Sequence, residues 1–110
     1  MKTYTEALAK LNGRDKRKLE NNTYLEKRIN GIAVRLHNTD VILYQPDGNI
    51  ILNSNGWHTV TTKDHLNKYS PAHVHQKNYK WFQGPYAFRD GMILTPSGQV
   101  ICTPEFATGL

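Results

Sequence analysis

Two Pro-x-Gly turns, each set between short apolar segments, constrain the fold of this chain more than any other feature. Residues 42–52 (ILYQPDGNIIL) align without a gap on residues 92–102 (MILTPSGQVIC). Proline presets the first central position of a turn and glycine adopts a positive φ, so both segments predict β-hairpins. The repeat is consistent with an internal duplication or with convergence on favourable hairpin chemistry. We favour convergence, because the residues flanking the two copies do not match.

Alternation of polar and apolar residues predicts further strands around these hairpins. Residues 23–28 alternate, Asn30-Gly31 is typical of a type I′ turn, and residues 32–36 have the pattern of a returning strand. These segments add up to a twisted antiparallel sheet of about five to seven strands. A further pair of short strands is predicted at residues 73–75 and 80–82.

A short N-terminal helix precedes the sheet. Thr3 and Glu6 have the spacing of a capping box, and Asn12 suits a left-handed C-cap. Leu8 and Leu11 supply apolar positions at helical spacing, and so short a helix must dock them on the sheet to be stable.

The main helix is predicted at residues 62–69, capped by Thr61 or Thr62 and ended by Pro71. The fold class is therefore α+β: a single small domain, a twisted antiparallel sheet of hairpins with one main helix and a short N-terminal helix.

A chain of 110 residues has room for one domain. Its single Cys102 excludes an intramolecular disulfide, which is typical of a reducing compartment. No apolar stretch is long enough for a membrane helix or signal peptide, so we expect no membrane partner. We divide the chain into a basic N-terminal helix and rim (1–19), a β-meander plus helix (20–70), and C-terminal hairpins with a loose tail (71–110).

The net charge of +5 is unevenly distributed. Residues 1–36 hold nine basic and four acidic side chains, whereas residues 37–110 balance to zero and contain all five histidines. This asymmetry favours an anionic partner approached from the N-terminal side, although a solvated face that only keeps the protein soluble would show it too. The candidate binding residues in this rim are Arg14, Lys16, Arg17 and Lys18.

The segment before the main helix is the densest in functional side chains. Helix N-termini bind anions through free N–H groups, and Thr59, Thr61 and Lys63 would add two hydroxyls and a positive charge. Trp57 could stack on a nucleobase. The alternative is that the threonines only cap the helix and Trp57 packs in the core.

Aromatic and basic residues alternate further along the chain. Such clusters hold single-stranded nucleic acid or form protein–protein hot spots, and at least half of this one must fill the core. From the cluster we select Trp81 and Arg89 as candidate binding residues. Its members are Lys77, Tyr79, Lys80, Trp81, Phe82, Tyr86, Phe88 and Arg89.

The histidines give no strong catalytic pattern. His37 and Asp40 lie in a polar corner for which an Asx-type turn, with Asp40 bonded to nearby backbone, is the favoured interpretation. His73 and His75 share a strand face and could ligate a metal only if His58, His65 or Asp90 converged on them. No nucleotide-binding, metalloprotease or nucleophile-elbow motif is present. We therefore expect no catalytic residues, no metal and no cofactor.

The central block of the chain resembles small proteins encoded by tailed bacteriophages and prophages. The resemblance covers residues 20–70 and rests on NTYL (22–25), IAVRLHNTDV (32–41), PDG (46–48) and LNSNGWHTVTTKDHLN (52–67). It implies a phage accessory protein in the host cytoplasm. Such proteins often bind nucleic acid or sequester a host component, including antiviral defences.

The primary hypothesis is thus a non-catalytic phage binding protein whose ligand is nucleic acid or a nucleotide. The first alternative is an inhibitor that binds a host protein or defence complex through exposed aromatic residues. The second is a small His-dependent nuclease. Open edge strands of such a sheet also make a homodimer one way of covering them.

Overall fold

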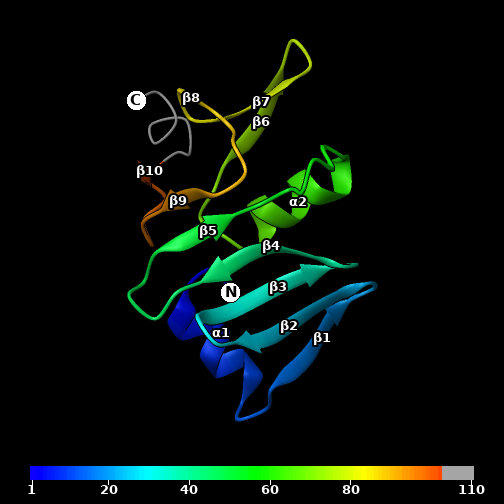
Figure 1. Ribbon diagram of the computed structural model, residues 1–110, viewed down its shortest axis with the longest axis vertical. Helices are drawn as coiled ribbons and strands as arrows, with labels where there is room; N and C mark the ends of the chain where they lie inside the picture. Colours follow the sequence, from blue (N-terminus) through cyan, green and yellow to red (C-terminus); the bar gives the residue numbers. More distant parts are fainter. Residues whose placement is uncertain (103–110) are drawn as a thin grey trace.

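The computed structural model describes residues 1–102 and contains a seven-stranded antiparallel sheet, a three-stranded antiparallel sheet and two helices (Figure 1). The large sheet has the order β1-β2-β3-β4-β5-β9-β10 and the small one the order β6-β7-β8. The helices are α1 (Tyr4–Leu11) and α2 (Val60–Lys68). The strands are β1 (Lys16–Glu20), β2 (Thr23–Arg28), β3 (Gly31–Leu36), β4 (Thr39–Tyr44), β5 (Ile50–Leu52), β6 (Val74–Lys77), β7 (Lys80–Gln83), β8 (Tyr86–Ala87), β9 (Met92–Leu94) and β10 (Val100–Cys102).

These elements confirm the predicted α+β class, with all strand pairs antiparallel. The structure forms one compact domain with a Cα radius of gyration of 13.4 Å. The predicted loose tail, residues 103–110, lies outside the described residues.

The predicted caps of α1 are confirmed. The Thr3 hydroxyl accepts from the Glu6 backbone N–H at 3.3 Å, and Asn12 has a left-handed φ of 51°. The predicted docking of Leu8 is wrong: its side chain is 46% exposed, and α1 instead buries Ala7 and Leu11. These two side chains, together with the partly buried Tyr4, form the side of this two-turn helix that meets the core.

The segment predicted as a basic rim contains strand β1, which pairs with β2 at the edge of the large sheet. The type I′ prediction for Asn30-Gly31 is also wrong. Arg28 pairs with Gly31, so the two central residues of the turn are Ile29 and Asn30. Neither has the positive φ that a type I′ turn requires.

The main helix begins earlier than predicted. α2 starts at Val60, and Thr59 rather than Thr61 or Thr62 is its N-cap. The Thr59 hydroxyl accepts from the Thr62 backbone N–H at 3.1 Å. Since threonine can cap from any of these positions, local sequence alone did not fix which one would do so.

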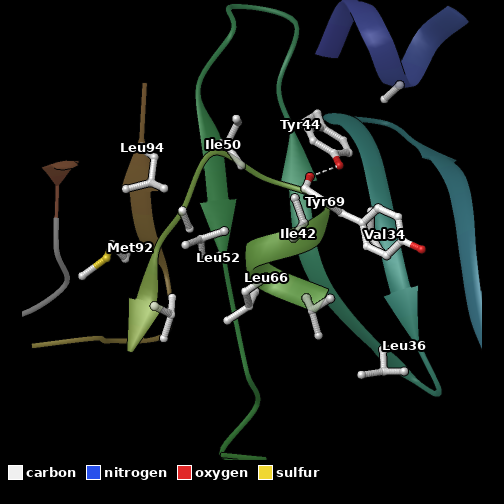
Figure 2. Close-up of a cluster of buried hydrophobic side chains, with 14 of the residues drawn as sticks. Val34, Leu36, Ile42, Tyr44, Ile50, Leu52, Leu66, Tyr69, Met92 and Leu94 are labelled. Carbon is white, nitrogen blue, oxygen red and sulfur yellow. Dashed lines mark hydrogen bonds between the residues drawn. The ribbon is translucent and has the colours of Figure 1, made fainter. Parts of the chain in front are cut away.

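Both helices pack on the same face of the large sheet and form the core with it. Figure 2 shows Leu66 and Tyr69 of the α2 segment beside Ile42 and Leu52, all of them buried. The buried Tyr44 hydroxyl donates to the Tyr69 carbonyl. Each fully buried aliphatic side chain of this kind contributes about 1.5–3 kcal/mol, so this layer holds α2 firmly against the sheet.

The two Pro-x-Gly hairpins have the same geometry and lie side by side through the β5–β9 pairing. In the first, Gln45 N–H donates to the Asn49 carbonyl at 2.9 Å; in the second, Thr95 N–H donates to the Gln99 carbonyl at 2.8 Å. The hairpin predictions are confirmed, and both origins proposed for the repeat are compatible with this match.

Candidate functional site

A pocket of about 510 Å³ lies where three segments meet: the β3–β4 turn, the loop after β5 and the first turn of α2. This volume falls in the range of roughly 300–1,000 Å³ that is usual for small-molecule sites. Three of the predicted binding residues, Trp57, Thr59 and Thr61, line it together. The full lining is Leu36, His37, Asn38, Thr39, Val41, Ser54, Asn55, Trp57, Thr59, Thr61 and Thr62.

Asp90, which is distant in sequence, holds the loop that carries Trp57. Its Oδ1 accepts from the backbone N–H of Ser54 at 2.8 Å and from the Ser54 hydroxyl at 2.7 Å, and its Oδ2 accepts from the Gly56 N–H at 3.3 Å. Asn55 has a left-handed φ of 51°, and its N–H donates to the Asn53 side chain at 2.8 Å. Asp90 therefore positions the loop, a role that sequence analysis missed.

The start of α2 presents unused hydrogen-bond donors beside the pocket. Thr59 satisfies the N–H groups of Thr62 and Lys63 through its hydroxyl and carbonyl oxygens, at 3.1 Å in both cases. Within residues 1–102, the N–H groups of Val60 and Thr61 have no such partner. The first turn of α2 also contains no acidic residue, so the positive end of its dipole is not neutralised locally.

The pocket itself is lined by neutral groups. Leu36 and Val41 provide apolar wall, while threonine, serine and asparagine side chains provide hydroxyl and amide groups. Trp57 is 64% exposed, so much of its ring is accessible. Lys63, the fourth residue predicted in this segment, is half-buried on α2 and is not part of the lining.

A second pocket of about 390 Å³ adjoins the first, sharing Asn38, Thr39 and Asn55 with it. It also contains two arginines, Arg28 and Arg35, which sequence analysis did not select. Its remaining lining residues are Asp40 and Asn53.

Ion pairs hold these arginines in place. Arg28 donates to both carboxylate oxygens of Asp40 at 2.9 Å, and this contact raises the pKa of Arg28. Arg35 donates to Glu26 at 2.7 Å, and Arg28 donates to its other oxygen at 2.9 Å. Burial acts to raise the pKa of Glu26, but these hydrogen bonds outweigh it and the pKa is lowered. The predicted Asx role of Asp40 is therefore wrong, because a long-range partner takes its carboxylate.

The basic rim is not brought to either pocket. Arg14, Lys16, Arg17 and Lys18 are exposed on or just before β1, and none of them lines a pocket. Strands β2 and β3 separate β1 from the β4 edge of the site. Lys16 lies 3.9 Å from Glu26 and 4.6 Å from the Tyr24 ring centre, while Arg17 donates to the Lys10 carbonyl at 2.9 Å.

Trp81 and Arg89 lie apart from the pockets as well. Trp81 is 5% exposed and stacks against the His58 ring at 4.3 Å, with Phe88 at its edge. Two of the five aromatic residues in the cluster, Trp81 and Phe88, are buried in the core, fewer than the predicted half. Arg89 is exposed and immediately precedes Asp90 in the chain.

The model of one protein family matches residues 1–108, nearly the whole chain, and its description is Kyanoviridae Gp96 protein. The chain belongs to the Kyanoviridae Gp96 family. This match confirms the resemblance to phage proteins and extends it beyond the central block. No curated protein and no solved structure matches this Gp96 chain. Neither α1 nor α2 is long and apolar enough to cross a membrane.

The histidines take separate positions in the structure. His58 stacks on Trp81, His65 is buried on α2, and His73 and His75 are exposed near β6. Within the described part of the chain, no three His, Cys, Asp or Glu side chains are grouped closely enough to hold a metal ion. Asp90, one of the possible metal ligands named above, instead accepts a hydrogen bond from Ser54 in the loop after β5.

A polar network, buried at its Thr23–His65 contact, joins the edge of the large sheet to the pocket helix. The Nδ1–H of His65 donates to the Thr61 carbonyl at 2.9 Å, and its Nε2 lies 2.8 Å from the Thr23 hydroxyl. Glu20 accepts from the Tyr69 hydroxyl and from Lys68 at 2.9 Å, and these hydrogen bonds lower the pKa of Glu20. These contacts tie α2 to β1 and β2.

Proposed function

We propose that this Gp96-family protein is a non-catalytic phage binding protein whose pocket at the start of α2 holds a nucleotide. The observation that carries the proposal is the meeting of Trp57, Thr59 and Thr61 in one cavity at a helix N-terminus with two unused N–H groups. Each of these groups suits a different part of the ligand.

The phosphate belongs at the first turn of α2. The N–H groups of Val60 and Thr61 and the neighbouring threonine hydroxyls donate hydrogen bonds, and the helix dipole favours a negative group there. Lys63 follows in the same turn and adds a positive charge within the same short segment. Among residues 1–102, no carboxylate lines the pocket to oppose an anion.

The base belongs against Trp57. An exposed indole is costly to leave in water, and stacking of a nucleobase on an aromatic side chain contributes about 1–3 kcal/mol. Leu36 and Val41 offer apolar contact within the same cavity. The hydroxyl and amide groups that complete the lining can meet the polar edge of the base or the sugar.

We place the protein in the host cytoplasm and expect it to act by capture rather than by chemistry. Where the structure describes the chain, the pocket lining contains no paired carboxylates and no cysteine, and the histidine in it, His37, lies on the β3–β4 turn. A phage protein that binds without converting its ligand would sequester a host component, including one used in antiviral defence.

Tryptophan fluorescence tests the proposal, because Trp57 is exposed and Trp81 is buried. Titration with nucleoside 5′-monophosphates should quench the Trp57 emission, and inorganic phosphate should compete. Thr61→Asp should weaken binding at least about tenfold, since it places a carboxylate where the phosphate lies. The same change should raise helix stability by about 0.3–1 kcal/mol, because it adds a negative charge to the first turn.

Thr61→Asn is the matched control. It changes the same side chain to one with the shape of aspartate but without its charge, and it keeps the backbone N–H of residue 61. It should weaken binding much less. Equal affinity of Thr61→Asp and wild-type protein, or no response to any monophosphate at low salt, would contradict the proposal.

A second candidate function, binding of a host protein, is favoured by one observation at the β6–β7 hairpin, which projects from the molecule (Figure 1). Lys77 pairs with Lys80, and the two turn residues, Asn78 and Tyr79, have positive φ values of 53° and 66°. Tyr79 is 95% exposed. A tyrosine in this conformation costs about 1–2 kcal/mol, and no packing against the rest of residues 1–102 offsets that cost. Contact with a partner would explain why it is there.

Tyr79→Gly separates stability from binding at this hairpin. Glycine adopts positive φ without strain, so the unfolding free energy should rise by about 1 kcal/mol in chemical denaturation. If Tyr79 is a hot spot, a host protein that co-purifies with the wild type should be lost from this variant. Retention of that protein would remove Tyr79 from the interface.

A further inference from the structure

The second pocket extends the nucleotide pocket onto the open face of the sheet. Asn38, Thr39 and Asn55 line both cavities, so one ligand can reach from one to the other. The first cavity has a neutral lining, whereas Arg28 and Arg35 line the second.

The charges at the second pocket favour an anion. Two guanidinium groups, Arg28 and Arg35, and one carboxylate, Asp40, line this pocket, and Glu26, which pairs with both arginines, is not among the lining residues. The side chains of Arg28 and Arg35 are 29% and 24% exposed, so water still reaches both guanidinium groups.

The arginines are also held in place before any ligand arrives. Arg28 is held by Asp40 and Glu26, and Arg35 by Glu26 at 2.6–2.7 Å. Binding of a ligand would therefore restrict these arginine side chains little further, which lowers the entropic cost of binding. Asn53 adds an amide: its carbonyl oxygen accepts from the Asn55 N–H, which leaves its NH2 group available as a donor.

We infer that the second pocket binds a second phosphate, so that the ligand is a dinucleotide unit rather than a mononucleotide. This inference rests on the proposed function, because the first nucleotide must occupy the pocket at α2. Either a free dinucleotide or the end of a single strand supplies the same chemistry.

Isothermal titration with a length series tests the inference. The probes are adenosine 5′-monophosphate, the linear 5′-phosphorylated dinucleotide pApA and an eight-adenosine strand with a 5′-phosphate. The dinucleotide should bind about tenfold more tightly than the monophosphate, because it adds one charge-assisted contact. Its affinity should also fall more steeply with salt, by about 0.7 in the log–log slope.

Asn53→Asp removes the donor and adds a negative charge while keeping the oxygen that accepts from Asn55. The tenfold preference for the dinucleotide should fall to about one in this variant. Asn49→Asp makes the same change at the residue that precedes β5. This control should keep the preference for the dinucleotide. A preference that Asn53→Asp leaves intact would overturn the assignment to this pocket.

The outcomes also separate the two proposals. If the monophosphate binds and the dinucleotide binds no more tightly and with the same salt slope, the inference fails and the proposed function stands. If neither binds, the proposed function fails and the inference with it. Equal affinity for the dinucleotide and the long strand supports a strand end, whereas weaker binding of the long strand supports a free dinucleotide.

Discussion

The β1 edge and the start of α2 are two regions of this molecule that could attract an anion, and they do so in opposite ways. The edge segment carries four exposed basic side chains: Lys16, Arg17 and Lys18 on β1, and Arg14 just before it. The start of α2 has no lining charge but offers a shaped cavity and free backbone donors. Charge and shape are therefore separated in this fold.

The difference shows that a surplus of charge in a sequence does not locate a binding site. Part of the β1 charge serves the fold itself: Lys16 lies near Glu26 and over the Tyr24 ring, and Arg17 donates to the Lys10 carbonyl. Basic side chains on an edge strand also discourage pairing with another chain. The α2 pocket relies instead on the partial positive charges of backbone N–H groups. A count of charged residues does not include these groups.

The largest effect is expected from Asp90→Ala, which should disable the pocket without touching its lining. It removes the acceptor for the N–H and hydroxyl of Ser54, which is 1% exposed, and so should lower the unfolding free energy by about 1–3 kcal/mol. Nucleotide binding should weaken at least about tenfold, because Trp57 loses its fixed loop. Denaturant titration and calorimetric binding measure the two effects.

Asp47→Ala is the control for this change. Asp47 Oδ1 accepts from the Asn49 N–H at 2.8 Å in the exposed β4–β5 turn, so the same residue type is removed from a similar backbone contact. Binding should not change in this variant. If Asp90→Ala binds as well as Asp47→Ala, the loop does not need Asp90 and our view of the pocket as a preformed site is wrong.

The smallest effect is expected at the β1 edge. Arg14→Glu combined with Lys18→Glu reverses two exposed charges that make no described ion pair. At about 0.15 M salt the Debye length is roughly 8 Å, so charges outside the pocket should change nucleotide affinity less than about twofold. A loss as large as that of Thr61→Asp would instead assign the ligand to the basic edge and break the contrast between the two regions.

The fold was predictable where its signals are local. The α1 caps depend on Thr3, Glu6 and Asn12 acting within a few residues, and the Pro-x-Gly turns are equally self-contained. Strand β1 was missed because it is an exposed edge strand rich in lysine and arginine, and only its pairing with β2 makes it a strand. Leu8 was misplaced because sequence spacing does not show which side of a short helix meets the sheet.

The site was predictable in part for the same reason. Trp57, Thr59 and Thr61 are neighbours in the chain, so their density was visible in the sequence and the fold keeps them together. The β3–β4 turn and Asp90 enter from about 20 and 30 residues away, through sheet pairing and a loop contact that no local pattern encodes. Trp81, like Trp57, lies among polar and basic residues in the sequence, yet it is buried and stacks against His58.

An NMR titration of the isotopically labelled protein with adenosine 5′-monophosphate tests the central claim most directly, because it locates the ligand residue by residue. We predict the largest shifts at the backbone amides of Val60 and Thr61 and at the indole N–H of Trp57, with the amides of Lys16 to Lys18 nearly unmoved. Largest shifts along β1, with α2 unmoved, would contradict the account.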